Sequence, residues 1–511
     1  MTNEIYWADH IIQKLNYPSY TIETAITPSG EIHLGNGREF FTGWALEQSA
    51  LDQGKPTTFY FSLDDADALR KVYPFLPEHY SEFVGRPLYL IPDPKGCHAS
   101  YSEHFSAPFV EVLEQFGAYP KISRMHELYE SGVMAPFIEL ALKNKDKIAQ
   151  ILTEVSGREI SPDWSPFNPL CKACKRINKT KVTDVDYTNK KVAYLCECEE
   201  KGDADYSKGE GKLNWRIEWP ARWKLWGINV EPIGKDHAAA GSSYDTGKRI
   251  VKEIFDGEPP FAPTYERIFL SGHVMHSSTG VTIVPKDVLK IVPAEILKYF
   301  ILRSRPEKHL DFDPGAGYIN LLEDYRLLEQ KILTKTTTEL EQKIYRFSQN
   351  TKDFKQILPN VPTRHLIAVL QAAQFEDDEV IRMLDQTGHG QATTNAQLLL
   401  VHSARVQNWL KDHAPEEFKF SLLTEAPKIK LTKEQKNLLI YITDLLKKDI
   451  SGEELHNEIY NYGQQQGLKP KETFEPIYQA LLGKSSGPKA GWFLSILDRD
   501  FVIERFKEVA T

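Results

Sequence analysis

Four residues, His33-Leu34-Gly35-Asn36, combine the groups that a polyphosphate site needs. They follow an extended segment that breaks on Pro28-Ser29-Gly30, and they open a stretch with the apolar spacing of a helix. A strand, a tight turn and a helix bring free N–H groups and the positive end of a helix dipole together, which favours phosphate. His33 and Asn36 could donate hydrogen bonds there, and Gly35 would let a nucleobase approach the backbone. A helix cap beside a surface histidine is the alternative interpretation.

Three carboxylates follow the next predicted strand. Residues 57–63 have the composition of a buried parallel strand, and Asp64, Asp65 and Asp67 come directly after it. Ligands of open α/β sheets lie outside the carboxyl ends of the strands, so these aspartates could receive a cationic substrate. Helix caps are the alternative for each of them.

Two clusters have the side chains of metal sites. The first packs one carboxylate, one thiol and two imidazoles into a loop, and its ligand types suit tetrahedral zinc, although the spacing matches no common zinc finger. A free cysteine beside surface histidines is therefore the alternative there. The second cluster has a C-x-x-C pair and a C-x-C pair around a basic, strand-like stretch, which indicates a zinc ribbon more than a redox motif. The candidate ligands are Asp93, Cys97, His98 and His104 in the first cluster and Cys171, Cys174, Cys196 and Cys198 in the second.

Other segments must position these groups. Residues up to about 16 have the pattern of an amphipathic helix, and residues 230–233 read as a strand that leads into Gly234-Lys235-Asp236-His237. Beyond residue 291, helical patterns dominate to the end of the chain. The 511 residues predict about three domains, and 41% hydrophobic with 26% charged residues are typical of a soluble globular protein. The net charge of −9 argues against indiscriminate nucleic-acid binding but permits a local basic face.

Several long motifs, in order along the chain, resemble the class I lysyl-tRNA synthetases, the archaeal and bacterial minority form. They are residues 24–36, 64–72 and 234–247, with a further match from Gly487 to Phe501. The resemblance implies an α/β fold, a class I synthetase Rossmann-like parallel sheet with a zinc-ribbon insertion, followed by an all-α C-terminal helical domain. The implied boundaries are 1–160 and 213–290 for the two halves of the catalytic domain, 161–212 for the ribbon, 291–320 for a stem and 321–511 for an anticodon-binding domain.

The same resemblance implies an ATP-dependent lysine–tRNA ligase of protein biosynthesis. It places ATP on His33, Gly35, Asn36, Gly234, Asp236, Met275 and Ser278, with His33, Asn36, Ser277 and Ser278 acting in catalysis. For lysine it implies a pocket from Ala25, Thr27, Trp215, His237 and Tyr265, and a buried cation would suit an aromatic face with Asp64 or Asp65 as its partner. The expected cofactors are Mg²⁺ with ATP and two structural zinc ions at the eight ligands named above. The expected partners are tRNA(Lys) and L-lysine, and we expect a cytoplasmic monomer without a membrane segment.

One motif departs from the family. Where the family has the KMSKS loop, its two lysines fall on Val274 and Thr279. Losing one preorganised charged donor typically costs about 3–4 kcal/mol of transition-state stabilisation. A catalytically impaired tRNA-binding paralogue is therefore the alternative function, and an adenylating enzyme with another acceptor is a second, which the helical C-terminal region disfavours. The missing charge could come from His273, His276 or Lys286.

Overall fold

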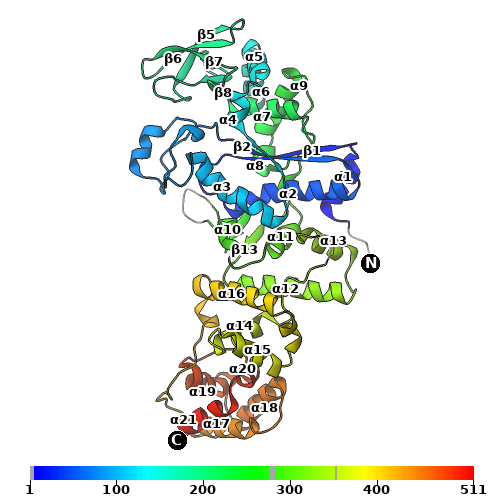
Figure 1. Cartoon of the computed structure of the whole chain (residues 1–511), viewed down its shortest axis with the longest axis vertical. Helices are drawn as coiled ribbons and strands as arrows, with labels where there is room; N and C mark the ends of the chain where they lie inside the picture. Colours follow the sequence, from blue (N-terminus) through cyan, green and yellow to red (C-terminus); the bar gives the residue numbers. More distant parts are fainter. Residues whose placement is uncertain (1–4, 276–281, 352–353) are drawn as a thin grey trace. The chain divides into compact units, whose positions relative to one another are not determined.

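The computed structural model describes residues 5–275, 282–351 and 354–511 (Figure 1). The chain forms two compact units. The first contains the segments Met1–Leu289, Leu297–Phe312 and Thr338–Asp353, and the second contains Lys290–Ile296, Asp313–Thr337 and Phe354–Thr511. In the described residues, no helix is long and apolar enough to cross a membrane.

A parallel sheet is the centre of the first unit. β1 (Tyr20–Ile26) pairs with β2 (Thr57–Leu63), and β2 pairs with β3 (Lys121–Arg124), all in parallel. On the other side of β1, Val230 bridges to Ile22 and to Phe261 in parallel. The same two segments then pair as β9 (Ile233–Gly234) and β10 (Thr264–Tyr265). The strand order reverses at β1, so a ligand crevice is expected at the carboxyl ends of β1 and β9.

Aromatic packing fixes the helix that follows β1. α2 (Leu34–Asp52) buries Phe40 against Phe59 and Phe61 of β2, with ring centroids 5.3 Å apart in both pairs. Alternate residues of β2 therefore face this helix, while Tyr60 on the opposite face stacks on Trp226 at the end of α7 (Trp215–Trp226). Burial on both faces explains why the strand reads as a nearly continuous apolar run.

The cysteine-rich insertion is an antiparallel module. β5 (Thr180–Asp186), β6 (Lys191–Cys196) and β7 (Lys201–Asp205) form one sheet. β4 (Phe167–Pro169) and β8 (Gly211–Leu213) pair with each other, so the module begins and ends at the same place.

The remaining elements of the first unit surround these two parts. Three further short strands, β11 to β13, form a small sheet. Their bounds and those of the helices are β11 (Ile268–Leu270), β12 (His273–Val274), β13 (Leu310–Phe312), α1 (Trp7–Leu15), α3 (Tyr101–Leu113), α4 (Met125–Glu130), α5 (Ala135–Lys143), α6 (Lys145–Ser156), α8 (Lys235–Ala238), α9 (Ser243–Glu253) and α10 (Pro285–Val288).

The second unit is helical throughout its described elements. Reciprocal capping boxes at Thr432 and Ser451 define the starts of α17 and α18. The helices of the later part of the chain are α11 (Ala294–Leu302), α12 (Ala316–Leu333), α14 (Thr363–Ala372), α15 (Asp377–Gln386), α16 (Ala396–Asp412), α17 (Lys433–Leu445), α18 (Gly452–Gln465), α19 (Pro470–Leu482), α20 (Ala490–Ile496) and α21 (Arg499–Ala510).

One helix departs from the expected boundaries. α13 (Glu339–Ser348) falls within the segment 321–511 that we expected to form the C-terminal domain, but it belongs to the first unit. Lys343 and Arg346 form ion pairs with Asp52 at the end of α2, and Phe347 packs edge-on against Trp44. These tertiary contacts, and not the helical pattern, decide where α13 packs.

Candidate active site

A first cavity of about 470 Å³ lies at the carboxyl ends of β1 and β9. The turn that begins α2 forms one wall, the start of α8 forms another, and β10 to β12 close the far side. Six of the residues expected to bind ATP line it together: His33, Gly35, Asn36, Gly234, Asp236 and Met275. The expected residues Ser277 and Ser278, like Thr279 and His276, lie outside the described residues.

The start of α2 is held by a local hydrogen bond. The side-chain oxygen of Asn36 accepts from the backbone N–H of His33 at 3.1 Å, which satisfies a donor at the helix terminus. The imidazole of His33 lies directly over Gly35, where a Cβ atom would come within 2.9 Å of the ring. Gly35 therefore lets the histidine ring and any ligand approach the backbone.

A second glycine shapes the opposite wall. A Cβ atom on Gly234 would lie 2.6 Å from Oδ1 of Asp236, so a side chain there would displace the carboxylate that faces the cavity. Lys235, next to it, forms an ion pair with Glu266.

Val274 lines the first cavity at the position where the family has a lysine. Of the substitutes considered from the sequence, Lys286 forms an ion pair with Glu111 at 3.4 Å, and His273 is exposed. Arg267 was not anticipated: it lines the cavity, is exposed, and makes no ion pair with any residue that the structure describes. It is thus a cation available on the cavity wall.

A second cavity, of about 390 Å³, adjoins the first. The two share Ala25, Ile26, Glu39 and His237. Of the residues expected to bind lysine, Ala25, Thr27, Asp64, Trp215 and His237 line the second cavity, and Tyr265 lines the first.

Asp65 is placed differently from the expectation. Its carboxylate accepts from the backbone N–H of His126 at 2.9 Å and lies 2.5 Å from the ring Nδ1 of the same histidine, and it lines neither cavity. Neighbouring residues at a strand end point to opposite faces, so only Asp64 reaches the crevice.

Two buried cations organise the carboxylates of the second cavity. Arg222 contacts Glu23 at 3.0 Å and also pairs with Asp64, while Lys212 contacts Glu218 at 3.1 Å and pairs with Asp67. Burial lowers the pKa of Arg222, but the surrounding carboxylates raise it more, so that the guanidinium stays charged. The hydroxyl of Thr27 donates to Asp67 at 3.0 Å, which adds a polar contact from the end of β1.

Glu39 holds a carboxylate at the junction of the two cavities. It accepts from the backbone N–H of Ala25 at 3.0 Å and from the hydroxyl of Tyr265. No cation pairs with it among the residues that the structure describes. Burial raises its pKa to about 7 despite the two hydrogen bonds. The carboxylate is therefore placed to pair with a cation that enters the cavity.

An indole pair satisfies another buried carboxylate. Glu231 accepts from the ring N–H of Trp219 at 2.7 Å and from that of Trp223. Burial raises the pKa of Glu231 well above its ordinary value. The second cavity is lined by five acidic side chains and by two cations, Arg70 and Arg222, so acidic groups predominate; the acidic residues are Glu39, Asp64, Asp67, Glu218 and Glu231.

The charged residues of α7 were missed from the sequence. Glu218 and Arg222 lie four residues apart among tryptophans, both almost fully buried. Charges within so aromatic a helix signal a buried ion-pair network, because an isolated buried charge would be costly.

The first metal cluster brings its four side chains together. The ligand atoms of Asp93, Cys97, His98 and His104 all lie within 4.8 Å of one another. Sγ of Cys97 lies 3.1 Å from Nδ1 of His98 and 3.2 Å from Nδ1 of His104. A tetrahedral zinc ion separates its ligand atoms by about 3.3–3.8 Å. The two distances from Cys97 are slightly shorter than that, so the four ligand atoms are gathered closely enough to hold one ion between them.

The second cluster brings the four remaining cysteines together in the same way. The sulfur atoms of Cys171 and Cys198 lie 3.6 Å apart, as do those of Cys174 and Cys196. These distances are too long for disulfides and close to the edge of a tetrahedron of zinc thiolates, about 3.8 Å.

Comparisons with known proteins identify the family of the chain. A family described as tRNA synthetases class I (K) matches residues 5–351, and one described as anticodon binding domain matches residues 404–510. The chain is 41% identical to lysine–tRNA ligase 1 of Methanosarcina acetivorans, over 99% of both chains. It is 40% identical to the lysine–tRNA ligase of Archaeoglobus fulgidus, over 98% of this chain and 99% of that one, and 38% identical to that of Thermoplasma volcanium, over 99% of both.

Proposed function

The chain belongs to the class I tRNA synthetases (K), and we propose that its two adjoining cavities bind ATP and L-lysine for transfer to tRNA(Lys). It is an ATP-dependent lysine–tRNA ligase. The relatives bear that name and match over essentially the whole chain, which favours the ligase over a catalytically impaired tRNA-binding paralogue.

ATP occupies the first cavity in this proposal. The turn of His33, Gly35 and Asn36 receives the phosphates at the start of α2, and the carboxylate of Asp236 accepts hydrogen bonds from the ribose hydroxyls. Magnesium, bound with ATP, supplies positive charge to the phosphate oxygens. Arg267 adds a cation on the same wall, which compensates in part for Val274 and Thr279.

Lysine occupies the second cavity. One observation carries this assignment: the second cavity, which is lined mainly by acidic side chains, meets the first cavity at Glu39, and the carboxylate of Glu39 has no cationic partner in the described part of the chain. An ammonium group of the substrate pairs with Glu39, and the indole of Trp215 covers the alkyl chain beside it. Glu39 thus takes the role that we expected of Asp64 or Asp65, because Arg222 already pairs with Asp64.

The reaction follows from this adjacency. The lysine carboxylate attacks the α-phosphorus of ATP, a P–O bond breaks, and pyrophosphate leaves. A terminal hydroxyl of tRNA(Lys) then attacks the acyl carbon and AMP leaves. No protein nucleophile is required, because positioning and charge stabilisation lower the barrier.

The two metal clusters have a structural role in this proposal. Each would hold one zinc ion, which would tie together a loop that lacks a large core of its own. The helical second unit would receive the anticodon arm, which agrees with the anticodon-binding match over residues 404–510.

Lysine-dependent exchange between pyrophosphate and ATP tests the function. We expect exchange with lysine, measured with and without tRNA(Lys), and far less with arginine, glutamate or cysteine. Binding of tRNA(Lys) without exchange or charging under any of these conditions would favour the impaired paralogue.

A further inference from the structure

Four of the five acidic side chains that line the second cavity already have partners within the chain. The four are Asp64, Asp67, Glu218 and Glu231. Arg222 pairs with the first, Lys212 pairs with the second and third, and two indoles donate hydrogen bonds to the fourth. Glu39 has neither a cation nor an indole as a partner among the residues that the structure describes.

Lys212 places an ammonium group of the protein itself behind this acidic wall. It lies on β8, in register with Asn168 of β4, and is 4% exposed. Its Nζ contacts Asp67 and lies 3.1 Å from Glu218, although Lys212 does not itself line the second cavity. Burial lowers the pKa of Lys212, but the two carboxylates raise it more, so the side chain stays charged. Its ammonium thus occupies the place beside them that a substrate ammonium could otherwise take.

Asp67 is the carboxylate that Lys212 most directly keeps from a ligand. Asp67 is half-buried on the cavity wall, whereas Glu218 is almost fully buried. Burial raises the pKa of Asp67, but Lys212 and the hydroxyl of Thr27 lower it more, so Asp67 is ionised near pH 7. Arg70, an exposed cation on the same wall, acts in the same direction as Lys212. The cavity therefore borders a charged carboxylate whose charge is already compensated.

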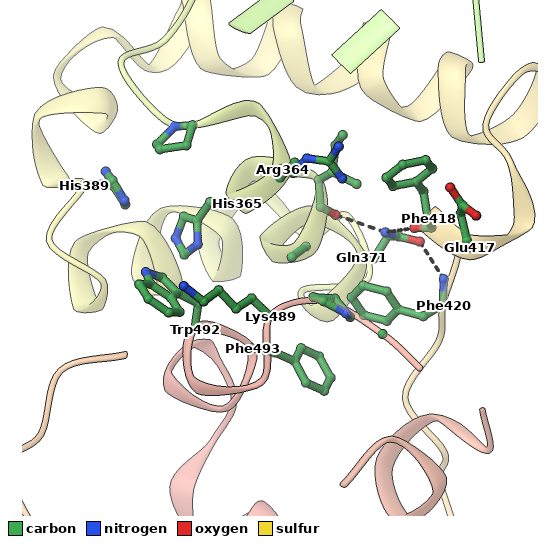
Figure 2. Close-up of a pocket in the computed structure, with 15 residues that line it drawn as sticks. Arg364, His365, Gln371, His389, Glu417, Phe418, Phe420, Lys489, Trp492 and Phe493 are labelled. Carbon is green, nitrogen blue, oxygen red and sulfur yellow. Dashed lines mark hydrogen bonds between the residues drawn. The ribbon is translucent and has the colours of Figure 1, made fainter. Parts of the chain in front are cut away.

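The cavity of about 450 Å³ in the helical unit has no such pairing (Figure 2). There the guanidinium of Arg364 lies 5.3 Å from the ring centroid of Phe418, and Nζ of Lys489 lies 3.9 Å from that of Trp492. Both cations are exposed, and neither makes an ion pair with a residue that the structure describes. The pairing of wall charges is thus a property of the second cavity and not of every concave surface of the chain.

We propose that Lys212 is a specificity-determining residue that keeps Asp67 and Glu218 paired, so that a substrate ammonium pairs with Glu39. The inference rests on the proposed ligase function. Lysine carries two ammonium groups, so a cavity with two free carboxylates would bind it in more than one register. Only the register that brings the lysine carboxylate to the first cavity can form the adenylate. Lys212 therefore lowers the total affinity for ammonium groups and favours the productive register.

The test measures binding of 1,5-diaminopentane to the full-length protein by isothermal titration calorimetry at pH 8. This diamine has two ammonium groups, as lysine does, but no carboxylate, so it reports ammonium pairing without any adenylate formation. Lys212→Met keeps the length of the side chain and removes its charge. We expect this variant to bind the diamine about tenfold more tightly than the wild type, because Asp67 is then free to pair.

Three further variants control for indirect effects. Lys298→Met removes another buried ammonium, which donates to the carbonyl of Phe116 at 2.8 Å and lines neither cavity, and it should leave the diamine affinity unchanged. Adding Asp67→Asn to Lys212→Met should abolish the gain, because the freed carboxylate is lost. Lys212→Gln keeps a hydrogen-bond donor without the charge and gives the same comparison if methionine impairs folding. Circular dichroism and thermal melting verify that each variant is folded.

The kinetics of lysine-dependent pyrophosphate exchange report the register. In Lys212→Met, kcat and KM for lysine should fall together by about tenfold, with kcat/KM within about twofold of the wild type, as non-productive binding requires. A raised KM with a lower kcat/KM would show a structural role instead and overturn the proposal. So would folded Lys212 variants that bind the diamine no more tightly than the wild type, or a gain that survives Asp67→Asn. Exchange by the wild-type protein separates the two claims, since its absence would overturn the ligase function, whereas the diamine titration does not depend on it.

Discussion

Glu39→Gln is the substitution that tests the lysine site most sharply. Glutamine keeps the shape of the side chain and can still accept from Ala25 N–H, but it removes the negative charge at the junction of the cavities. Truncating one partner of a buried, hydrogen-bonded charge pair costs about 2–5 kcal/mol. The dissociation constant for lysine should therefore rise between about 30-fold and several thousandfold.

The pH dependence gives an independent signature. Burial raises the pKa of Glu39 to about 7, so near neutral pH half of the free protein carries the proton. An ammonium pairs with the ionised form, so affinity should fall about tenfold for each pH unit below 7 and level off above it. Lysine binding should release about half a proton at pH 7 and about 0.9 at pH 6. In Glu39→Gln both effects should disappear.

Isothermal titration calorimetry in buffers of different ionisation enthalpy measures affinity and proton release together. Glu47→Gln is a matched control, because Glu47 lies on the same helix with a pKa that burial raises to about 7, yet it lines neither cavity. It should bind lysine as the wild type does. Equal lysine affinity in Glu39→Gln and Glu47→Gln, or proton release that persists in Glu39→Gln, would refute the pairing.

Three further predictions concern other parts of the first unit. Arg267→Ala should lower the rate of adenylate formation about a hundredfold or more, with the KM for lysine unchanged. The control Arg249→Ala removes a surface ion pair and should leave pyrophosphate exchange intact. Equal exchange rates in the two variants would exclude Arg267 from the phosphate site. Arg222→Met should destabilise the fold by about 3–5 kcal/mol in urea unfolding at pH 8. The variant should regain stability as the pH falls, because burial raises the folded-state pKa of Glu23 and Asp64, which lose their partner, and their protonation then favours folding. A loss of unfolding free energy that does not change with pH would contradict this explanation. Elemental analysis should find two zinc ions per chain in the wild type and one in each of the variants Cys174→Ser and Cys97→Ser. In Cys174→Ser the zinc ribbon should also become sensitive to proteolysis. An unchanged zinc content in either variant would exclude that cluster as a zinc site.

Local patterns in the sequence predicted the elements that form the walls of the first cavity. The breaker residues before His33 and the apolar spacing after it locate the start of α2, because a helix terminus depends on a few neighbouring residues. The cysteine pairs likewise report a shared site through their spacing. The class I fold itself followed from the order of long motifs and agrees with the family match.

Tertiary contacts, which local patterns do not express, decide which acidic side chains reach the cavities. Glu39 reads as an ordinary helical glutamate, and only the packing of α2 against β1 and β10 brings its carboxylate to Ala25 and Tyr265. Asp64 and Asp65 are equivalent in sequence, but opposite side-chain directions at the strand end separate them. The cavity around Trp492 joins segments more than a hundred residues apart, a closeness that no local pattern expresses.

A crystal structure with a non-hydrolysable analogue of lysyl-adenylate would show directly whether the first cavity binds the adenosine and the second the lysine side chain. We expect the adenosine ribose on Asp236 in the first cavity and a lysine ammonium within hydrogen-bond distance of Glu39, with the linkage between them where the cavities meet. An analogue bound with its ammonium away from Glu39, or with its side chain outside the second cavity, would refute the assignment of the two cavities.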